Sequence, residues 1–107
     1  MSKTLVIGAG KSGIAAANFL AGEGQESVVL SDSKSDPDLV YPLNDRVVRA
    51  FGTQHESLLR DVDAVVLSPG VPANAPILLR AAALQIPVIG EIELAFRHLR
   101  GTVIAVT

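Results

Sequence analysis

The chain contains no cysteine among its 107 residues, which excludes disulfide bonds and thiolate metal sites. It also has no apolar run that approaches the roughly 20 residues of a membrane-spanning helix. The apolar run that follows the first four residues is too short for the hydrophobic region of a signal peptide. These absences predict a cytoplasmic protein without a membrane partner.

Aromatic residues are scarce, at 4% of the chain, and the formal net charge is -2 with the basic residues scattered along the sequence. Nucleic-acid binding requires a positively charged stripe, often with stacking aromatic rings, and neither is visible here. We therefore expect no nucleic-acid partner. The length fits one domain with a sizeable core, and 49% of the residues are hydrophobic.

The hydrophobic residues form short runs rich in valine, isoleucine and leucine, which alternate with helical patterns. Such runs are typical of parallel strands buried on both faces. We expect strands at 4–7, 27–31, 47–50, 63–68, 87–89 and 102–106, and helices at 12–22, 54–61, 75–84 and 91–99. An irregular loop is expected at 33–45. Right-handed crossovers then predict a Rossmann-like, doubly wound α/β sheet with strand order 3-2-1-4-5.

A Gly-rich turn, Gly8-Ala9-Gly10-Lys11-Ser12-Gly13, joins the first expected strand to the first expected helix. In such turns the first glycine permits the tight bend, the second lets a ligand approach the backbone, and the third lets the helix pack closely. The helix N-terminus stabilises an anion. Asp32 follows Gly13 at about the 20-residue spacing of the acidic residue that binds a ribose hydroxyl in dinucleotide sites. The alternative is a plain turn, with Asp32 merely starting a loop.

Ser68-Pro69-Gly70, after the fourth expected strand, adds a hydroxyl and a stiff, accessible backbone near the switch point of the sheet. An ordinary turn is the alternative. No motif places a base beside Ser12 or Ser68, so the sequence supports no serine nucleophile and no catalytic residue. Lys11 could equally pair with a ligand anion or be solvated.

Glu91 and Glu93 fall in the first turn of an expected helix, where carboxylates favour the helix dipole. Their spacing does not put them on one helical face, so they are not a catalytic pair. The sequence predicts no metal site.

Together these segments resemble the amino-terminal domain of the Mur ligases, the ATP-dependent amino-acid ligases of peptidoglycan synthesis. The resemblance rests on Gly8–Gly13, Ser31-Asp32-Ser33-Lys34, Leu67-Ser68-Pro69-Gly70-Val71-Pro72 and Gly90-Glu91-Ile92-Glu93-Leu94. The first turn and the segment after the fourth strand favour the D-glutamate-adding branch over the L-alanine-adding one. Val103–Thr107 looks like the lead-in to the ATP-binding P-loop of that family. We therefore expect a UDP-binding domain at 1–100 and, at 101–107, the first strand of an absent ATP-binding domain.

The resemblance implies that the Gly-rich turn binds UDP rather than NAD. Carried over by position, Gly8, Gly10, Lys11, Ser12 and Gly13 would surround the diphosphate and uridine region. Asp32, Ser33 and Lys34 would hold the uracil end, and Ser68, Pro69 and Gly70 would line the same cleft. The family often has arginine where this chain has Lys34, and lysine lacks the planar, bidentate guanidinium.

The resemblance also implies a reaction for the whole enzyme. ATP, with Mg²⁺, would phosphorylate the carboxylate of UDP-N-acetylmuramoyl-L-alanine, and the amine of D-glutamate would attack the acyl phosphate. The enzyme would be a cytoplasmic monomer of cell-wall biogenesis, cell division and cell shape. This fragment would bind the UDP moiety without catalysing ligation.

Two alternatives remain open from the sequence. One is an NAD(P)-binding domain of an oxidoreductase, in which Lys34 contacts a 2′-phosphate. The other is a regulatory nucleotide-binding module that forms a dimer. A Gly-x-x-Gly-Lys-Ser/Thr sequence after Thr107 would favour the ligase, and its absence would exclude it.

Overall fold

The computed structural model describes residues 3–22, 27–52, 55–68, 70–72 and 74–90. The helix expected at 91–99, which contains Glu91 and Glu93, and the strand expected at 102–106 lie outside the described residues. Pro69 also lies outside them. No helix in the described part of the chain is long and apolar enough to cross a membrane.

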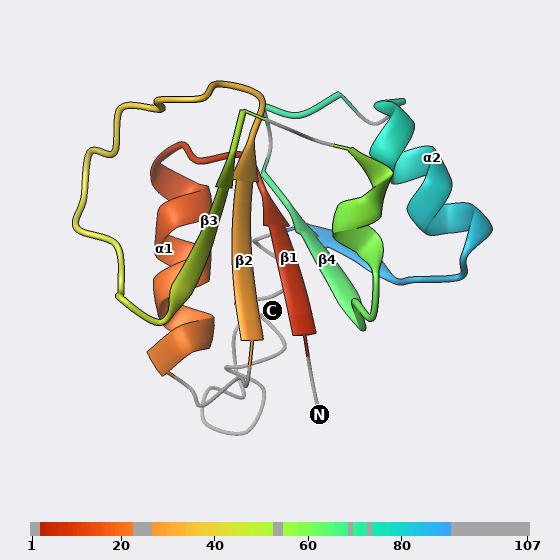
Figure 1. Ribbon diagram of the computed structural model, residues 1–107, viewed down its shortest axis with the longest axis horizontal. Helices are drawn as coiled ribbons and strands as arrows, with labels where there is room; N and C mark the ends of the chain where they lie inside the picture. The colour runs from red at the N-terminus through yellow and green to blue at the C-terminus, as the bar shows by residue number, and fades with distance from the viewer. Residues whose placement is uncertain (1–2, 23–26, 53–54, 69, 73, 91–107) are drawn as a thin grey trace, which may run out of the picture.

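Five parallel strands form one sheet in the order β3-β2-β1-β4-β5, which confirms the predicted topology (Figure 1). The strands are β1 (Lys3–Ile7), β2 (Ser27–Asp32), β3 (Val47–Phe51), β4 (Ala64–Leu67) and β5 (Val88–Gly90). Each begins and ends within one residue of its expected position. Both faces of the sheet are covered, so its strands consist of continuous runs of branched apolar residues, and these runs made the strands predictable.

The register brings the carboxyl ends of the three central strands level with one another. Ile7, the last residue of β1, lies beside Ser31 of β2 and beside Leu67 of β4. The segments that leave these strands therefore start from one edge of the sheet, at the top of Figure 1. In open parallel sheets this edge is where ligands bind.

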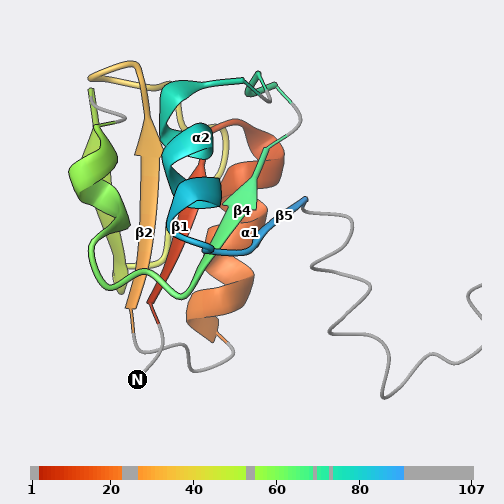
Figure 2. The same cartoon turned by 90° about the vertical axis from the view of Figure 1, so that its right-hand side faces the viewer.

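Helices cover both faces of the sheet. Helix α1 (Lys11–Gly22) lies on one face, and the 3₁₀ helix η1 (Glu56–Leu59) lies with α2 (Pro76–Ala83) on the other (Figures 1 and 2). Successive strand residues point to opposite faces, so β1 sends Val6 toward α1 and Leu5 and Ile7 toward α2. The sheet is thus the middle of three layers.

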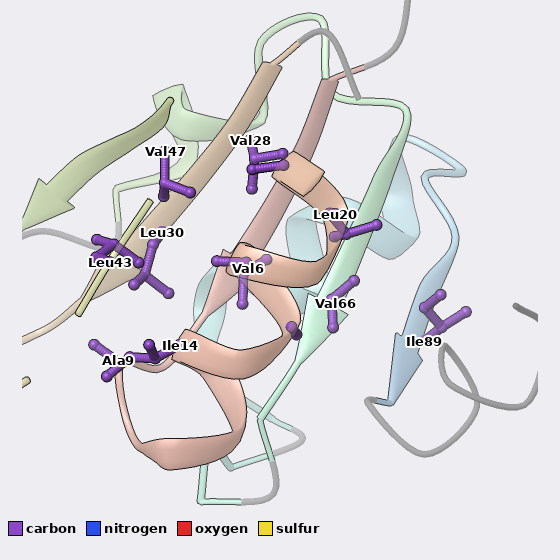
Figure 3. Packing of buried hydrophobic residues seen from close by; sticks show 13 residues of the cluster. Val6, Ala9, Ile14, Leu20, Val28, Leu30, Leu43, Val47, Val66 and Ile89 are labelled. Atoms are coloured by element: carbon purple, nitrogen blue, oxygen red, sulfur yellow. The ribbon is translucent and has the colours of Figure 1, made fainter. Parts of the chain in front are cut away.

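The α1 face packs through small side chains. Ala16, Ala17 and Ala21 of the helix are buried together with Ile14 and Leu20. Figure 3 shows the labelled members of this cluster, in which helix residues meet strand residues such as Val6, Leu30 and Val66. Because alanine adds little bulk, the helix backbone approaches the sheet closely. Burial of each large aliphatic side chain in this cluster contributes about 1.5–3 kcal/mol to the stability of the fold.

One predicted helix is wrong in length and type. In place of a helix at 54–61, the described residues form only η1, with Leu59 as its buried residue. Both flanking residues are extended: His55 has φ −68° and ψ 145°, and Arg60 has φ −61° and ψ 124°. The imidazole of His55 accepts the Ser57 N–H at 3.0 Å, which starts the turn locally. With one buried anchor, the segment lacks the repeated apolar stripe that sustains a longer helix.

The predicted loop between β2 and β3 is irregular, and α1 fastens it. The Asn18 side chain donates to the Pro42 carbonyl at 2.9 Å and accepts the Asn44 N–H at 2.7 Å. Beside it, Leu43 is buried in the α1 cluster. The Arg46 guanidinium donates to the Ala21 carbonyl in the last turn of α1 at 3.2 Å, where the helix dipole favours a cation.

Candidate functional site

Three segments that are far apart in the sequence surround one cavity at the carboxyl edge of the sheet. Its volume is about 470 Å³. Its walls come from the Gly-rich turn, the end of β2 and the segment after β4: Gly8, Ala9, Gly10, Ser12, Asp32, Ser33, Ser68, Gly70, Val71 and Pro72. The sequence predicted a ligand site in the same three segments.

Gly8 makes the bend that turns β1 toward α1. Its φ is +103°, a conformation that L side chains rarely adopt, and its N–H donates to the Ser31 carbonyl at 2.8 Å. A Cβ at this position would lie 2.7 Å from the Cβ of Ser68. The Gly-rich turn and the segment after β4 therefore approach each other only because residue 8 has no side chain.

The other two glycines of the turn have different surroundings. A Cβ on Gly13 would overlap the Gly8 carbonyl oxygen, so Gly13 lets the first turn of α1 sit on the bend. A Cβ on Gly10 would meet nothing within 4 Å, so the backbone here is open toward the cavity. Ile14 donates the first helical hydrogen bond, to the Gly10 carbonyl. The N–H groups before it point out of the helix, as in anion sites at helix N-termini.

The Asp32 carboxylate connects two of the segments. Its Oδ2 accepts the Ala9 N–H at 2.8 Å, and its Oδ1 accepts the Lys34 N–H at 3.0 Å. The sequence predicted a ligand contact for Asp32 but gave no reason to expect these backbone contacts. Each carboxylate oxygen has a further lone pair. Asp32 therefore anchors the Gly-rich turn and keeps acceptor capacity at the cavity wall.

Ser68 is buried, at 8% exposure, and its backbone is fixed on both sides. Its N–H donates to the Ile7 carbonyl at 3.1 Å, and its carbonyl accepts the Val71 N–H at 3.1 Å. The segment after β4 is thus a held turn with its hydroxyl-bearing residue at the cavity wall.

Three residues expected to bind ligand do not line the cavity. Lys11 and Lys34 are exposed and outside its wall, and Gly13 lies beneath the turn. The structure thus brings together seven of the predicted residues: Gly8, Gly10, Ser12, Asp32, Ser33, Ser68 and Gly70.

Sequence reasoning missed other residues of the region. Ala9, Val71 and Pro72 line the cavity, and nothing in their residue types marks them. Ser31 lies beneath the edge, fully buried, and its hydroxyl has no hydrogen-bond partner among the described residues. Within the part of the chain that the structure describes, no three His, Asp or Glu side chains gather as a metal site would require. The cavity is suited to binding a polar ligand through backbone N–H groups and hydroxyls.

The amino-acid sequence of this chain is similar to those of proteins from a known family. Residues 2–90 match the family described as Mur ligase MurD-like, N-terminal domain. A UDP-N-acetylmuramoylalanine--D-glutamate ligase from Koribacter versatilis is 46% identical over 109 residues, covering 98% of this chain and 24% of the relative. The ligase of the same name from a Nostoc species is 42% identical over 104 residues, covering 94% and 22%. The chain spans about a quarter of the length of these curated relatives.

Two solved structures share the fold at 18% identity. UDP-N-acetylmuramate-alanine ligase MurC from Thermotoga maritima gives a TM-score of 0.69 and covers 94% of this chain and 23% of that one. TunA, an NAD-dependent NDP-hexosamine 5,6-dehydratase of tunicamycin biosynthesis, gives 0.61 and covers 84% and 36%. The fold therefore occurs with different chemistries, and sequence similarity distinguishes between them. On that similarity, the chain belongs to the MurD-like Mur ligases and corresponds to their N-terminal domain.

Proposed function

We propose that this chain is the UDP-binding part of an ATP-dependent ligase that joins D-glutamate to UDP-N-acetylmuramoyl-L-alanine. The observation that carries the proposal is the cavity of about 470 Å³ beside the N-terminus of α1, in a chain whose relatives bear that activity in their names. The volume lies in the usual range for sites that bind small molecules.

The residues divide by the part of the nucleotide that they would hold. The open backbone at Gly10 and the N-terminal turn of α1, with Ser12, suit the diphosphate because N–H groups and the helix dipole favour an anion there. Lys11 does not line the cavity, so any contact with the diphosphate would come from its backbone N–H in the first turn of α1. Asp32 and Ser33 would hold the uracil end.

The other residues predicted to bind the ligand would lie around the nucleotide or shape the turn beneath it. Ser68 and Gly70 would form the opposite wall. Pro69, which was predicted to line the same cleft, lies outside the described residues. Lys34 is exposed beside the turn and would reach the ligand only at the rim. Gly8 and Gly13 would act by shaping the turn, because neither could carry a side chain there.

The catalytic groups would come from other parts of the protein. ATP and D-glutamate would bind there, because the chain spans about a quarter of the length of its relatives. We propose that Mg²⁺ binds in those parts as well, together with the ATP phosphates. We propose that residues 1–100 are the UDP-binding domain, that 101–107 lead into an ATP-binding domain, and that this chain alone does not ligate.

The cellular setting follows from the same proposal. The ligase would act in the cytoplasm as a monomer, in peptidoglycan synthesis, and would thereby serve cell division and cell shape. Its partners would be the nucleotide sugar, D-glutamate and ATP, without nucleic acid.

An NAD(P)-binding oxidoreductase domain or regulatory module is the second candidate. The Gly-rich turn and Asp32 favour it as much as they favour UDP, because dinucleotide sites use the same turn and an acidic residue at the end of the second strand. The relatives count against it, since they carry the name of a ligase.

Saturation-transfer NMR on the 107-residue chain tests the two candidates directly. UDP-N-acetylmuramoyl-L-alanine, UDP, NADH and NADPH serve as probes, with Gly10→Leu to fill the open backbone and Gly22→Ala as a matched control. We expect transfer to the uracil protons, lost in Gly10→Leu and kept in Gly22→Ala. Transfer to adenine protons without transfer to UDP would support the second candidate. Silence from all four probes would contradict UDP binding by this chain.

A further inference from the structure

Gly52, the first residue after β3, does not line the cavity but holds the turn that does. Its N–H donates to two carbonyl oxygens, Asp32 O at 2.9 Å and Lys34 O at 2.8 Å. One donor thus bridges both ends of the short turn that follows β2. Because β3 pairs with β2 up to Phe51 beside Asp32, the sheet delivers Gly52 to this position.

Position 52 strongly favours glycine. Its φ is +83°, which L side chains rarely adopt, and a Cβ would lie 3.1 Å from the Cβ and 3.2 Å from the Cα of Ser35. Conformation and crowding therefore both disfavour an L side chain at this position. Of the described glycines, only Gly8, at the cavity wall, shares a positive φ with Gly52.

The turn that Gly52 holds is also hydrogen-bonded to the Gly-rich turn, through the side chain of Asp32. Lys34 is bound at both its polar backbone atoms, with its N–H on Asp32 Oδ1 and its carbonyl on Gly52. Asp32 is bound through its carbonyl to Gly52 and through Oδ2 to the Ala9 N–H. A hydrogen-bond relay therefore runs from β3 through the Asp32 carboxylate to the backbone that faces the cavity.

We propose that Gly52 is a positioning residue for the nucleotide cavity. By fixing the Asp32–Lys34 turn, it orients the Asp32 carboxylate so that the Gly-rich turn and Ser33 are preorganised before a ligand arrives. A preorganised site spends less binding free energy on ordering loops, so loss of the Gly52 contacts weakens binding without removing any group that touches the ligand. The choice of UDP as probe rests on the proposed function, whereas the relay rests on the contacts alone.

The test compares the two mirror-image alanines at one position in the 107-residue chain. Chemical synthesis gives Gly52→Ala and the same chain with D-alanine at position 52, and Gly22→Ala is the control in open space. D-alanine favours positive φ and places its methyl group away from the L-Cβ position that crowds Ser35. Two quantities are measured: UDP affinity by titration and hydrogen-exchange protection of the Ala9 amide by NMR.

We expect Gly52→Ala to weaken UDP binding by on the order of tenfold and to lower the protection of the Ala9 amide, which lies on a different turn. D-alanine should restore both, and Gly22→Ala should change neither. A merely structural role would lower stability without a selective change at Ala9. If Gly52→Ala folds and keeps wild-type affinity and Ala9 protection, the proposal is wrong.

A second variant decides the case in which Gly52→Ala does not fold. Glycolic acid in place of Gly52 removes the N–H donor and adds no side chain, so it should still lower both UDP affinity and Ala9 protection. Unchanged values would overturn the proposal. If the wild-type chain itself fails to bind UDP, the proposed function fails, and the Ala9 amide alone then decides whether the relay exists.

Discussion

The two turns that meet at the cavity are held in different ways. The Gly-rich turn is shaped by its own residues, since Gly8 makes the bend and Gly13, having no side chain, leaves room for the Gly8 carbonyl oxygen beneath the first turn of α1. Its contacts with β2, from the Gly8 and Ala9 N–H groups to Ser31 and Asp32, add to this local shape. The turn after β2 is held from outside, by the Gly52 N–H at the end of β3 and by the Ala9 N–H of the Gly-rich turn, which donates to Asp32. A locally built turn leaves a sequence pattern, whereas a turn held by distant residues leaves almost none.

Gly13→Ala should break the locally built turn and have the largest effect. The added methyl group would overlap the Gly8 carbonyl oxygen, so α1 must move away from the bend. We expect the free energy of unfolding to fall by about 3 kcal/mol, at the upper end of overpacking effects. Urea denaturation measures it, with Gly22→Ala as a control that should stay within about 1 kcal/mol. Equal stabilities of the two variants would show that the turn relaxes freely.

Asp32→Asn should break the turn that is held from outside. The amide keeps one carbonyl oxygen but replaces the other acceptor with an NH₂ group, so it cannot accept from both Ala9 and Lys34. We expect a loss of about 1–3 kcal/mol in the free energy of unfolding. Asp36→Asn changes an exposed carboxylate of the same loop and should have little effect. A neutral Asp32→Asn would mean that the two turns are positioned independently.

Asn18→Asp sharpens the comparison by testing how the rest of the loop is fastened. Aspartate keeps the acceptor for the Asn44 N–H but loses the donor to the Pro42 carbonyl and adds a charge facing that oxygen. We expect a loss of about 1–2 kcal/mol and faster proteolysis within 33–46. Asn74→Asp, at an exposed position, is the control. Unchanged proteolysis would show that buried Leu43 anchors the loop by itself.

Ser31→Ala should have the smallest effect, and it should be favourable. The hydroxyl is buried without a partner among the described residues, and an unpaired buried hydroxyl costs roughly 1–3 kcal/mol on protein scales. Removing the hydroxyl avoids this cost but leaves a small cavity, which is itself destabilising. We therefore expect the free energy of unfolding to rise by at most about 1 kcal/mol. A loss of stability would mean that the hydroxyl has a partner, such as a buried water.

These contrasts explain how far the sequence predicts the molecule. The strand order was predictable because each apolar run is short and because crossovers between parallel strands are right-handed in nearly all proteins. The segment at 54–61 was not, because His55 starts a 3₁₀ turn through its own side chain and Arg60 returns to extended backbone. The spacing of apolar residues cannot show that a side chain, here the imidazole of His55, accepts the hydrogen bond that would otherwise go to a helix carbonyl.

The same distinction applies to the site. That Gly8, Gly10 and Asp32 lie together at one cavity could be predicted because their spacing is characteristic and local. Gly52 was not predicted because its hydrogen bonds to Asp32 and Lys34 depend on β3 lying beside β2. Lys11 and Lys34 were expected at the cavity but do not line it, because sequence spacing does not indicate which residues of a turn face a cavity. Sequence therefore predicted which segments meet, and the structure supplies what holds them there.

The alanine-rich face of α1 has a consequence for how this domain can change. Gly13, Ala16, Ala17 and Ala21 set the distance between helix and sheet, and the same helix presents its N-terminus to the cavity. A larger residue at Ala17, which is fully buried, would lift the whole helix and with it the electrostatic end of the site. Substitutions at these interior positions would therefore change the affinity for the proposed ligand without altering any residue of the cavity wall.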